Sequence, residues 1–498
     1  MRLPFLRPGL RVEFFARMND DDGMKILHVW LWCAAVCWTA AWAVDGELTA
    51  PEDADPGTVY SLRQIEAVDA IQARWEADHD GDGQYWFRRG VRADRVAQSV
   101  EVLAESTGLT SEAPVEFILI GPTSGHDYEA LAVSYARPSD IHRALEFIGM
   151  DPGAPFNPPG RRFFPKGERV WVSVTWTGPD GQAHQWPAEA LIRDGRTGEA
   201  LPQEGFVFVG SQWLTETGER VYAADSREPQ SVLSVYNEAI TVLDRPRRVA
   251  KGEVYGWLHA HPEREFEAGQ LLRIRLEPEH RDDWRRVRDV TLSLAPGADH
   301  QPLALVLRDE QGEPLHEGRA LVNVLAAFNR IVEREQTPFV QLELHADTPL
   351  REARDVSRLL KAFEDEETLH IEPPRPGELY YRAFIPEEEH RDRAQRPSQV
   401  LELRLAQADG EWRGTVVEVR DVRERREDDF KAEVREVPVA SAGELAAVLA
   451  EIGHRLPVLL VFVSEIATYG QVMQWIGPVQ ETHPIIYLYL EADGAATE

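Results

Sequence analysis

The chain is 498 residues long, carries a formal net charge of −31 and contains only two cysteines. Nucleic acids and anionic membrane surfaces are bound through clusters of Lys and Arg, so an acidic excess of this size argues against either as the main partner. The length is sufficient for several domains of ordinary size, each with its own hydrophobic core.

The N-terminal segment has the features of an export signal. Lys25 follows Met24, residues 26–40 are almost entirely apolar, and Ala41-Trp42-Ala43 has small residues at the spacing of a cleavage site. We therefore expect translation to start at Met24 and residues 1–43 to be leader and signal peptide, which places the protein in the periplasm or cell envelope. The alternative is that the apolar run is retained as a membrane anchor.

Both cysteines, Cys33 and Cys37, lie within this predicted signal segment. Its removal would leave a chain without any thiol. Thiol catalysis, thiolate metal sites and Cys-ligated iron–sulfur clusters are then excluded, and the folded state depends on ordinary cores instead of disulfides.

Residues 44–87 are expected to be a linker followed by a helix over residues 61–77 and an Asp/Gly turn. The turn copies the first half of a calcium loop, with Gly83 at the sixth position. Its candidate oxygen ligands are Asp78, Asp80 and Asp82. The twelfth position is Arg89, where a calcium loop needs a bidentate Glu, so a turn that caps the helix is the alternative.

Residues 88–285 are predicted to form a strand-rich domain, because short apolar or alternating runs recur between turn residues. Its strands are expected at residues 115–120, 131–135, 170–177, 190–193, 206–210 and 271–276. One helix is expected near residues 139–148, with Ser139 as its N-cap and Gly149 as its stop.

The C-terminal part contains a weak internal duplication, at residues 290–375 and 398–492. Each copy is predicted to be a small β-α-β-α-β module whose strands and helices pack as two layers. The charge-dense residues 385–397 and 419–436 are expected to be solvated connectors or exposed hairpin arms. The fold class predicted for the chain is therefore α+β or mixed α/β.

A family resemblance rests on the block from Gly125 to Gly149. Residues 126–131, His-Asp-Tyr-Glu-Ala-Leu, precede residues 138–145, Pro-Ser-Asp-Ile-His-Arg-Ala-Leu. This order resembles the YdjY-type domain of exported bacterial proteins, and the likeness extends over about residues 88–280. The resemblance implies an envelope protein with no established enzymatic activity.

The two C-terminal copies resemble the periplasmic domain of ExbD/TolR-type biopolymer-transport proteins. Residues 467–475, Ala-Thr-Tyr-Gly-Gln-Val-Met-Gln-Trp, are the better match, and residues 345–350 are the poorer one. Those transport proteins carry a membrane helix with a proton-binding Asp, which has no counterpart near these copies. The resemblance therefore implies a scaffold that binds another envelope protein or itself, without the motor function.

The residues that could bind a divalent metal are His126, Glu129 and His142, with Asp127 and Asp140 nearby. Imidazole and carboxylate suit zinc, and an open coordination position would permit hydrolysis. Residues at odd spacing in a strand face opposite ways, so His126 and Glu129 converge only if the chain turns there. The alternative is that His142 bonds Glu146 or the strand that carries Glu129.

A second possible metal clip is formed by His259 and His261, which share one face of a short strand. Surface histidines in front of a polar turn are the alternative.

The function expected from these features is an exported, non-enzymatic binding or scaffold protein. Two alternatives remain: a metal-dependent hydrolase that uses His126, Glu129 and His142, and a membrane-anchored, stator-associated component of a transport system.

Overall fold

The computed structural model describes residues 60–77, 81, 83–178, 181–216, 218–279, 286–295, 304–333, 336–391, 400–421, 432–453 and 457–492. The predicted leader and signal segment lies outside these residues, as do Asp78, Asp80 and Asp82 of the expected calcium loop. None of the described helices is long and apolar enough to cross a membrane.

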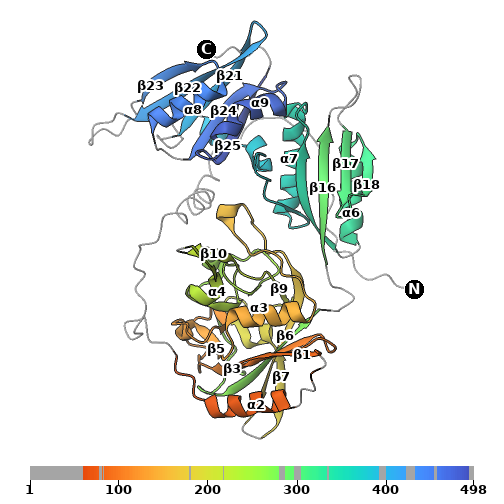
Figure 1. The fold of residues 1–498 in the computed structure, drawn as a ribbon, viewed down its shortest axis with the longest axis vertical. Coiled ribbons are helices and arrows are strands. Elements are labelled where there is room, and N and C mark those ends of the chain that lie inside the picture. The colour runs from red at the N-terminus through yellow and green to blue at the C-terminus, as the bar shows by residue number, and fades with distance from the viewer. Residues whose placement is uncertain are drawn as a thin grey trace. The chain divides into compact units, whose positions relative to one another are not determined.

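Eight strands of the N-terminal domain close into a barrel, because β3 pairs with β15 on one side and with β5 on the other. Around the barrel the order is β3 (Ser99–Ser106), β15 (Leu271–Pro278), β6 (Glu168–Thr177), β9 (Phe206–Phe208), β13 (Leu243–Asp244), β12 (Ser231–Ser234), β4 (Phe117–Ile120) and β5 (Ala130–Ser134). The strand-rich character predicted for this region is confirmed, and the whole chain is of mixed α+β type (Figure 1).

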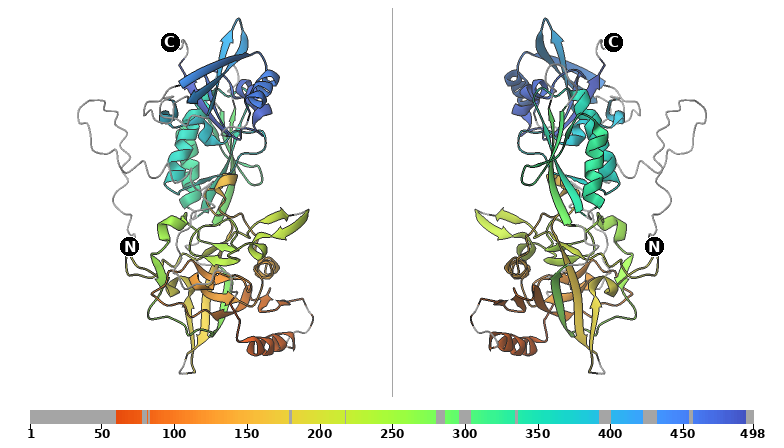
Figure 2. Two further views of the ribbon diagram at one scale, coloured as in Figure 1. Left: turned by 90° about the vertical axis from the view of Figure 1, so that its left-hand side faces the viewer. Right: turned by 90° about the vertical axis from the view of Figure 1, so that its right-hand side faces the viewer.

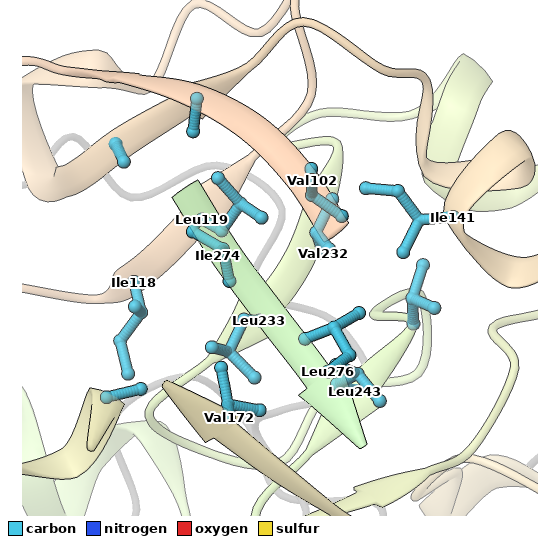
Figure 3. Packing of buried hydrophobic residues seen from close by; sticks show 14 of the residues in the cluster. Val102, Ile118, Leu119, Ile141, Val172, Val232, Leu233, Leu243, Ile274 and Leu276 are labelled. Atoms are coloured by element: carbon cyan, nitrogen blue, oxygen red, sulfur yellow. The ribbon is translucent and has the colours of Figure 1, made fainter. Parts of the chain in front are cut away.

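The barrel core is built by the inward face of each strand. Ile274 of β15 pairs with Val102 of β3 and with Val174 of β6, and all three are almost fully buried. Figure 3 shows Val232, Leu233 and Leu243 of the opposite strands in the same cluster. Each such side chain contributes about 1.5–3 kcal/mol through burial, so the closed sheet supplies a core of its own.

Shorter elements surround the barrel. They are α2 (Ile65–Ala77), β1 (Tyr85–Arg88), β2 (Val91–Asp94), η1 (Asp127–Glu129), α3 (Pro138–Phe147), η2 (Pro158–Gly160), β7 (Ala183–Pro187), η3 (Ala188–Leu191), β8 (Ile192–Asp194), β10 (Trp213–Glu216), β11 (Glu219–Tyr222), α4 (Ala223–Ser226), α5 (Lys251–Val254) and β14 (Leu258–Ala260).

The start of α3 differs from the sequence-based expectation. The helix begins at Pro138 and Arg137 occupies the N-cap position, so the prediction of Ser139 as the cap was wrong. Asp225 of α4 supplies the capping group instead: its carboxylate accepts the Ser139 backbone N–H at 2.9 Å and the Ser139 hydroxyl at 2.5 Å. A carboxylate at a helix N-terminus satisfies free N–H groups and complements the helix dipole.

Two five-stranded sheets follow the barrel. The first has the order β18-β17-β16-β19-β20 and the second β23-β22-β21-β24-β25. The first module contains β16 (Arg286–Ala295), β17 (Ala304–Asp309), β18 (Pro314–Gly318), α6 (Leu321–Glu333), β19 (Gln336–Leu344), α7 (Leu350–Asp365) and β20 (His370–Ile371). The second contains β21 (Leu401–Ala408), β22 (Glu411–Asp421), β23 (Ala432–Val439), α8 (Ala442–Ile452), β24 (Val458–Ser464), α9 (Tyr469–Ile476), η7 (Gly477–Val479) and β25 (Ile485–Glu491). The connector between the modules carries η5 (Tyr381–Phe384) and η6 (Glu388–Arg391).

Each module therefore opens with three antiparallel strands before its first helix, where the sequence predicted one. In the second module, β22 and β23 extend into both ends of the charge-dense region 419–436 and pair antiparallel, which agrees with the hairpin-arm alternative. The exposed charged side chains of β23, such as Arg435 and Glu436, suit its position at the edge of the sheet, where charge discourages pairing with other chains.

The modules contact each other through equivalent segments, each of which joins the central parallel strand to the following helix. The Tyr469 N–H donates to Thr348 O at 2.8 Å, and the Leu350 N–H donates to Ala467 O at 2.9 Å. Pro349 and Thr468 face each other as an antiparallel bridge. Leu350 is fully buried in the core of the second module, so the two copies are joined by hydrophobic packing as well as by backbone bonds. Figure 2 shows the two modules from opposite sides.

Candidate functional site

A single turn brings His126 and Glu129 together. His126 precedes the 3-10 turn η1, and its Nδ1 donates to Glu129 Oε1 at 2.5 Å. Strand geometry would have placed the two side chains on opposite faces, but the turn supplies the reversal on which their convergence depended. The Tyr128 hydroxyl lies 3.2 Å from the same His126 nitrogen.

The environment of His126 favours its charged form. The hydrogen bond with Glu129 raises the pKa of His126, and this effect exceeds the opposing effect of burial. Its other ring nitrogen lies 3.9 Å from Glu228 Oε2, and the side chain is 30 % exposed. Phe117 of β4 meets the ring edge-on, with ring centroids 6.4 Å apart. His126 is thus held in place at the barrel surface, in surroundings that favour its charged form.

A second acid–base pair lies beside the first. Lys251 of α5 donates to Glu116 Oε2 at 2.6 Å, and burial raises the pKa of Glu116. The Lys251 ammonium also lies 5.4 Å from the ring centroid of Tyr236 and 5.6 Å from that of Tyr255. A cation over an aromatic face is attracted by the ring quadrupole, so Lys251 links the buried carboxylate to the exposed ring of Tyr255.

Glu238 is a further, partly buried acid beside these two pairs. Burial raises its pKa to about 7, and the nearby Glu116 carboxylate adds to the rise. Its Oε1 is withdrawn from solvent and has no hydrogen-bond partner among the described residues. Glu238 therefore titrates near neutral pH, close enough to His126 and Lys251 for their charges to act on it.

Two exposed tyrosine rings contact the cluster, Tyr128 at His126 and Tyr255 at Lys251. Tyr128 is 44 % exposed, Tyr255 is 53 % exposed, and Trp257 follows two residues later at 49 %. Burial raises the pKa of the Tyr128 hydroxyl to about 12, and Glu129, Glu116 and Tyr255 add to the rise. We call His126, Tyr128, Lys251 and Tyr255 the His126 surface.

His142 does not join this surface. Its Nδ1 bonds the Tyr222 hydroxyl at 2.9 Å, and its ring packs edge-on against Phe208 at 5.1 Å. The expected contact with Glu146 is present, with Nε2 to Oε1 at 3.4 Å. The idea that His142 braces the strand carrying Glu129 was wrong: it braces β9 and β11. Burial lowers the pKa of His142, which favours the neutral ring.

Comparison with known families agrees with the resemblance found from Gly125 to Gly149. Residues 91–220 match the YdjY domain. The YdjY-like region contains His126, Glu129 and His142 but ends before Lys251 and Tyr255, which complete the His126 surface from outside it. No curated protein matches the chain.

The three metal ligands proposed from sequence are not brought together. Two of them meet, but no group of three His, Cys, Asp or Glu side chains suited to a metal ion occurs in the described part of the chain. Asp127 starts the η1 turn and Asp140 lies in the first turn of α3, and burial raises the pKa of both. Metal analysis of the purified protein tests the hydrolase alternative directly, because stoichiometric zinc lost on His126→Ala would support it.

The second histidine pair makes backbone contacts instead. His259 lies on β14, with Nδ1 3.2 Å from Ala113 O and Nε2 3.2 Å from Gly256 O. His261 follows the strand, and its Nδ1 accepts the Glu263 N–H at 3.3 Å. Burial lowers the pKa of His261, with Arg264 adding to the effect. These contacts hold the edge of the two-stranded antiparallel sheet formed by β8 and β14.

Sequence analysis missed Glu116, Glu238 and Lys251. Glu116 carries a signal, because it is a lone carboxylate at the start of an apolar strand, where a charge needs a partner. Its partner, Lys251, is 135 residues away in the chain. The sequence around Lys251 contains no feature that predicts this pairing. Glu105 is likewise a carboxylate in an apolar strand, and it also has partners. Its carboxylate accepts the N–H groups of Arg63 at 2.8 Å and Gln64 at 3.0 Å, just before α2.

Proposed function

We propose that the protein is an exported, non-enzymatic binding or scaffold protein of the bacterial periplasm or cell envelope. The observation that carries this proposal is the His126 surface, where exposed Tyr128 and Tyr255 stand above charged groups that already pair with each other. Rings with a polar tip contribute strongly to interfaces, because they bury apolar area and still hydrogen-bond. The ion pairs beneath them hold the rings in place.

The C-terminal modules support the scaffold part of the proposal. Their resemblance to ExbD/TolR-type periplasmic domains rests on residues 467–475, where Thr468 and Gln471 form a capping box at the start of α9. The two copies have the same strand order and pack through equivalent segments, as subunits of a symmetric dimer do. The partner we propose is another envelope protein or a second copy of this chain.

A photo-crosslinking experiment in producing cells tests the binding surface. A benzophenone amino acid replaces Tyr255 in the full chain, and the control carries it at Val96, which is 77 % exposed in the turn between β2 and β3. We expect a discrete protein adduct from position 255 that position 96 does not give. The same adducts from both positions, or none from either, would contradict the proposal.

The mature N-terminus tests the location. Mass spectrometry of the protein from the producing organism should find it at Val44 if the signal is removed as proposed. Retention of residues 26–40 would favour the membrane-anchored, stator-associated alternative instead.

A further inference from the structure

A pocket of about 220 Å³ opens between the two C-terminal modules. One wall is α7 of the first module, the second is the connector that carries η5 and η6, and the third is β25 of the second module. Its lining residues are Arg354, Arg358, Lys361, Phe384, Ile385, Pro386, Glu388, Arg391, Leu488, Tyr489 and Leu490. The pocket is therefore a product of the paired modules, and neither module contains all of its walls.

Four cationic side chains line this pocket against one carboxylate. Arg354, Arg358 and Lys361 are spaced by four and three residues along α7, which places them on one helix face. Arg391 approaches from the connector, where its Nη1 lies 3.7 Å from Glu388 Oε2. The chain as a whole has a net charge of −31, so a local cluster of four cations is not explained by the need for a soluble surface.

This positive charge is only partly paired within the described residues. Arg358 is exposed and has no ion pair with a described residue. The Arg354 Nη2 lies 3.5 Å from Glu465 Oε2 and its Nε lies 3.8 Å from Asp355 Oδ1. Both contacts are long, and the buried Nε has no hydrogen-bond partner among the described residues. Lys361 pairs with Asp365 one turn on. Guanidinium donors that lack acceptors favour an external anion.

We propose that this pocket binds a small ligand whose anionic group is a phosphate. Several cations around one cavity suit a dianion better than a single carboxylate, and Arg presents paired donors that match phosphate oxygens. Ile385, Pro386 and Leu490 are half-buried and give the pocket an apolar side, so a phosphate ester with a small apolar or aromatic body fits better than inorganic phosphate. This site is separate from the His126 surface and does not depend on the scaffold function.

Binding at this pocket would also strengthen the contact between the modules. A ligand held by α7 and the connector on one side and by β25 on the other stabilises the arrangement in which these walls meet. Thermal unfolding of the full chain should then shift upward with phosphate concentration.

Isothermal titration calorimetry of the full chain tests the proposal with two probes, inorganic phosphate and phenyl phosphate, at constant chloride and constant neutral pH. We expect saturable binding of both, with phenyl phosphate binding several-fold more tightly. Arg358→Gln should weaken both by about tenfold or more, because it removes charge-assisted hydrogen bonds. Arg391→Gln, on a different wall, should weaken them as well.

The matched control is Arg330→Gln, which removes the same charge from an exposed position on α6 and should leave both affinities unchanged. Circular dichroism confirms that each variant is folded. Absence of saturable binding to the wild-type chain, or equal affinities for wild type and Arg358→Gln, would overturn the site. Equal affinities for the two probes would overturn the apolar part of the ligand.

Discussion

At the scale of single residues, the protein combines ion pairs and titratable groups that sequence proximity only partly predicts. His126 and Glu129 are three residues apart and meet through one turn, whereas Glu116 and Lys251 meet across the fold. Both pairs are partly withdrawn from water, so their protonation is linked to folding.

The His126–Glu129 pair predicts a pH-dependent stability. Since the folded pKa of His126 is raised, its contribution is fully present below the ordinary histidine pKa and is lost as pH rises through the folded value. His126→Gln should therefore cost about 1 kcal/mol at about pH 5.5 and almost nothing at about pH 9. Urea unfolding at both pH values measures this. An equal cost at the two pH values would show that His126 acts through packing alone.

Glu238 predicts the same direction of pH dependence, because its folded pKa is raised as well, but here the substitution changes stability at high pH. A carboxyl group whose folded pKa is about 7 favours the neutral form, so the wild type loses stability as pH rises from the ordinary glutamate pKa to above 7. Glu238→Gln should be more stable than the wild type by up to about 3 kcal/mol at about pH 8.5 and equal to it at about pH 4. The control is Glu112→Gln, which makes the same change at an exposed position and should be neutral at both. A stability gain that does not vary with pH would argue against burial of the charge.

At the scale of helices and strands, the sequence predicted the buried segments well and the exposed ones poorly. The strands β4, β6 and β15 and the helix α3 lie close to their predicted positions, because apolar periodicity reports the face that is buried. The edge strand β23 was predicted only as part of a connector or an exposed hairpin arm, since its charged residues show no apolar periodicity. The first strand of each module and its antiparallel partners depend on pairing that periodicity does not encode.

The contact between the modules provides a matched test at this scale. Gly470 and Gly443 are each the second residue of a helix, in α9 and α8. A Cβ at Gly470 would lie 2.8 Å from Ala346 Cβ and 2.9 Å from Ala346 O, whereas at Gly443 it would meet only Ser441 Oγ at 3.8 Å.

Gly470→Ala should therefore destabilise the chain by about 1–3 kcal/mol, because the backbone of Ala346 must move. Gly443→Ala should be neutral or stabilising by about 0.5–1 kcal/mol, since Ala is the better helix former. Chemical denaturation of the two variants measures both effects. If they behave alike, the segments do not pack as closely as the structure places them.

At the scale of the whole molecule, the closed barrel predicts an independently folding unit. The buried residues of its main hydrophobic cluster all lie between Val91 and Leu276, and its sheet closes on itself without help from the modules. A fragment of residues 58–285 should be soluble and unfold cooperatively, as followed by circular dichroism and heteronuclear NMR. An insoluble or proteolysed fragment would contradict the predicted domain boundary. In this fragment Phe163 should become exposed, because in the full chain it packs against the core of the first C-terminal module.

The sequence by itself determined the acidic character, the YdjY-like motif and the positions of most buried strands and helices, because these are written in composition and in local periodicity. Only the tertiary structure decided that β3 and β5 close the barrel, that His142 pairs with Tyr222, and that Lys251 neutralises Glu116. It also decided that two modules meet to enclose a basic pocket. The physical reason is that a residue's spacing shows which face is buried but not which distant segment covers it, and that choice depends on the packing of the whole chain.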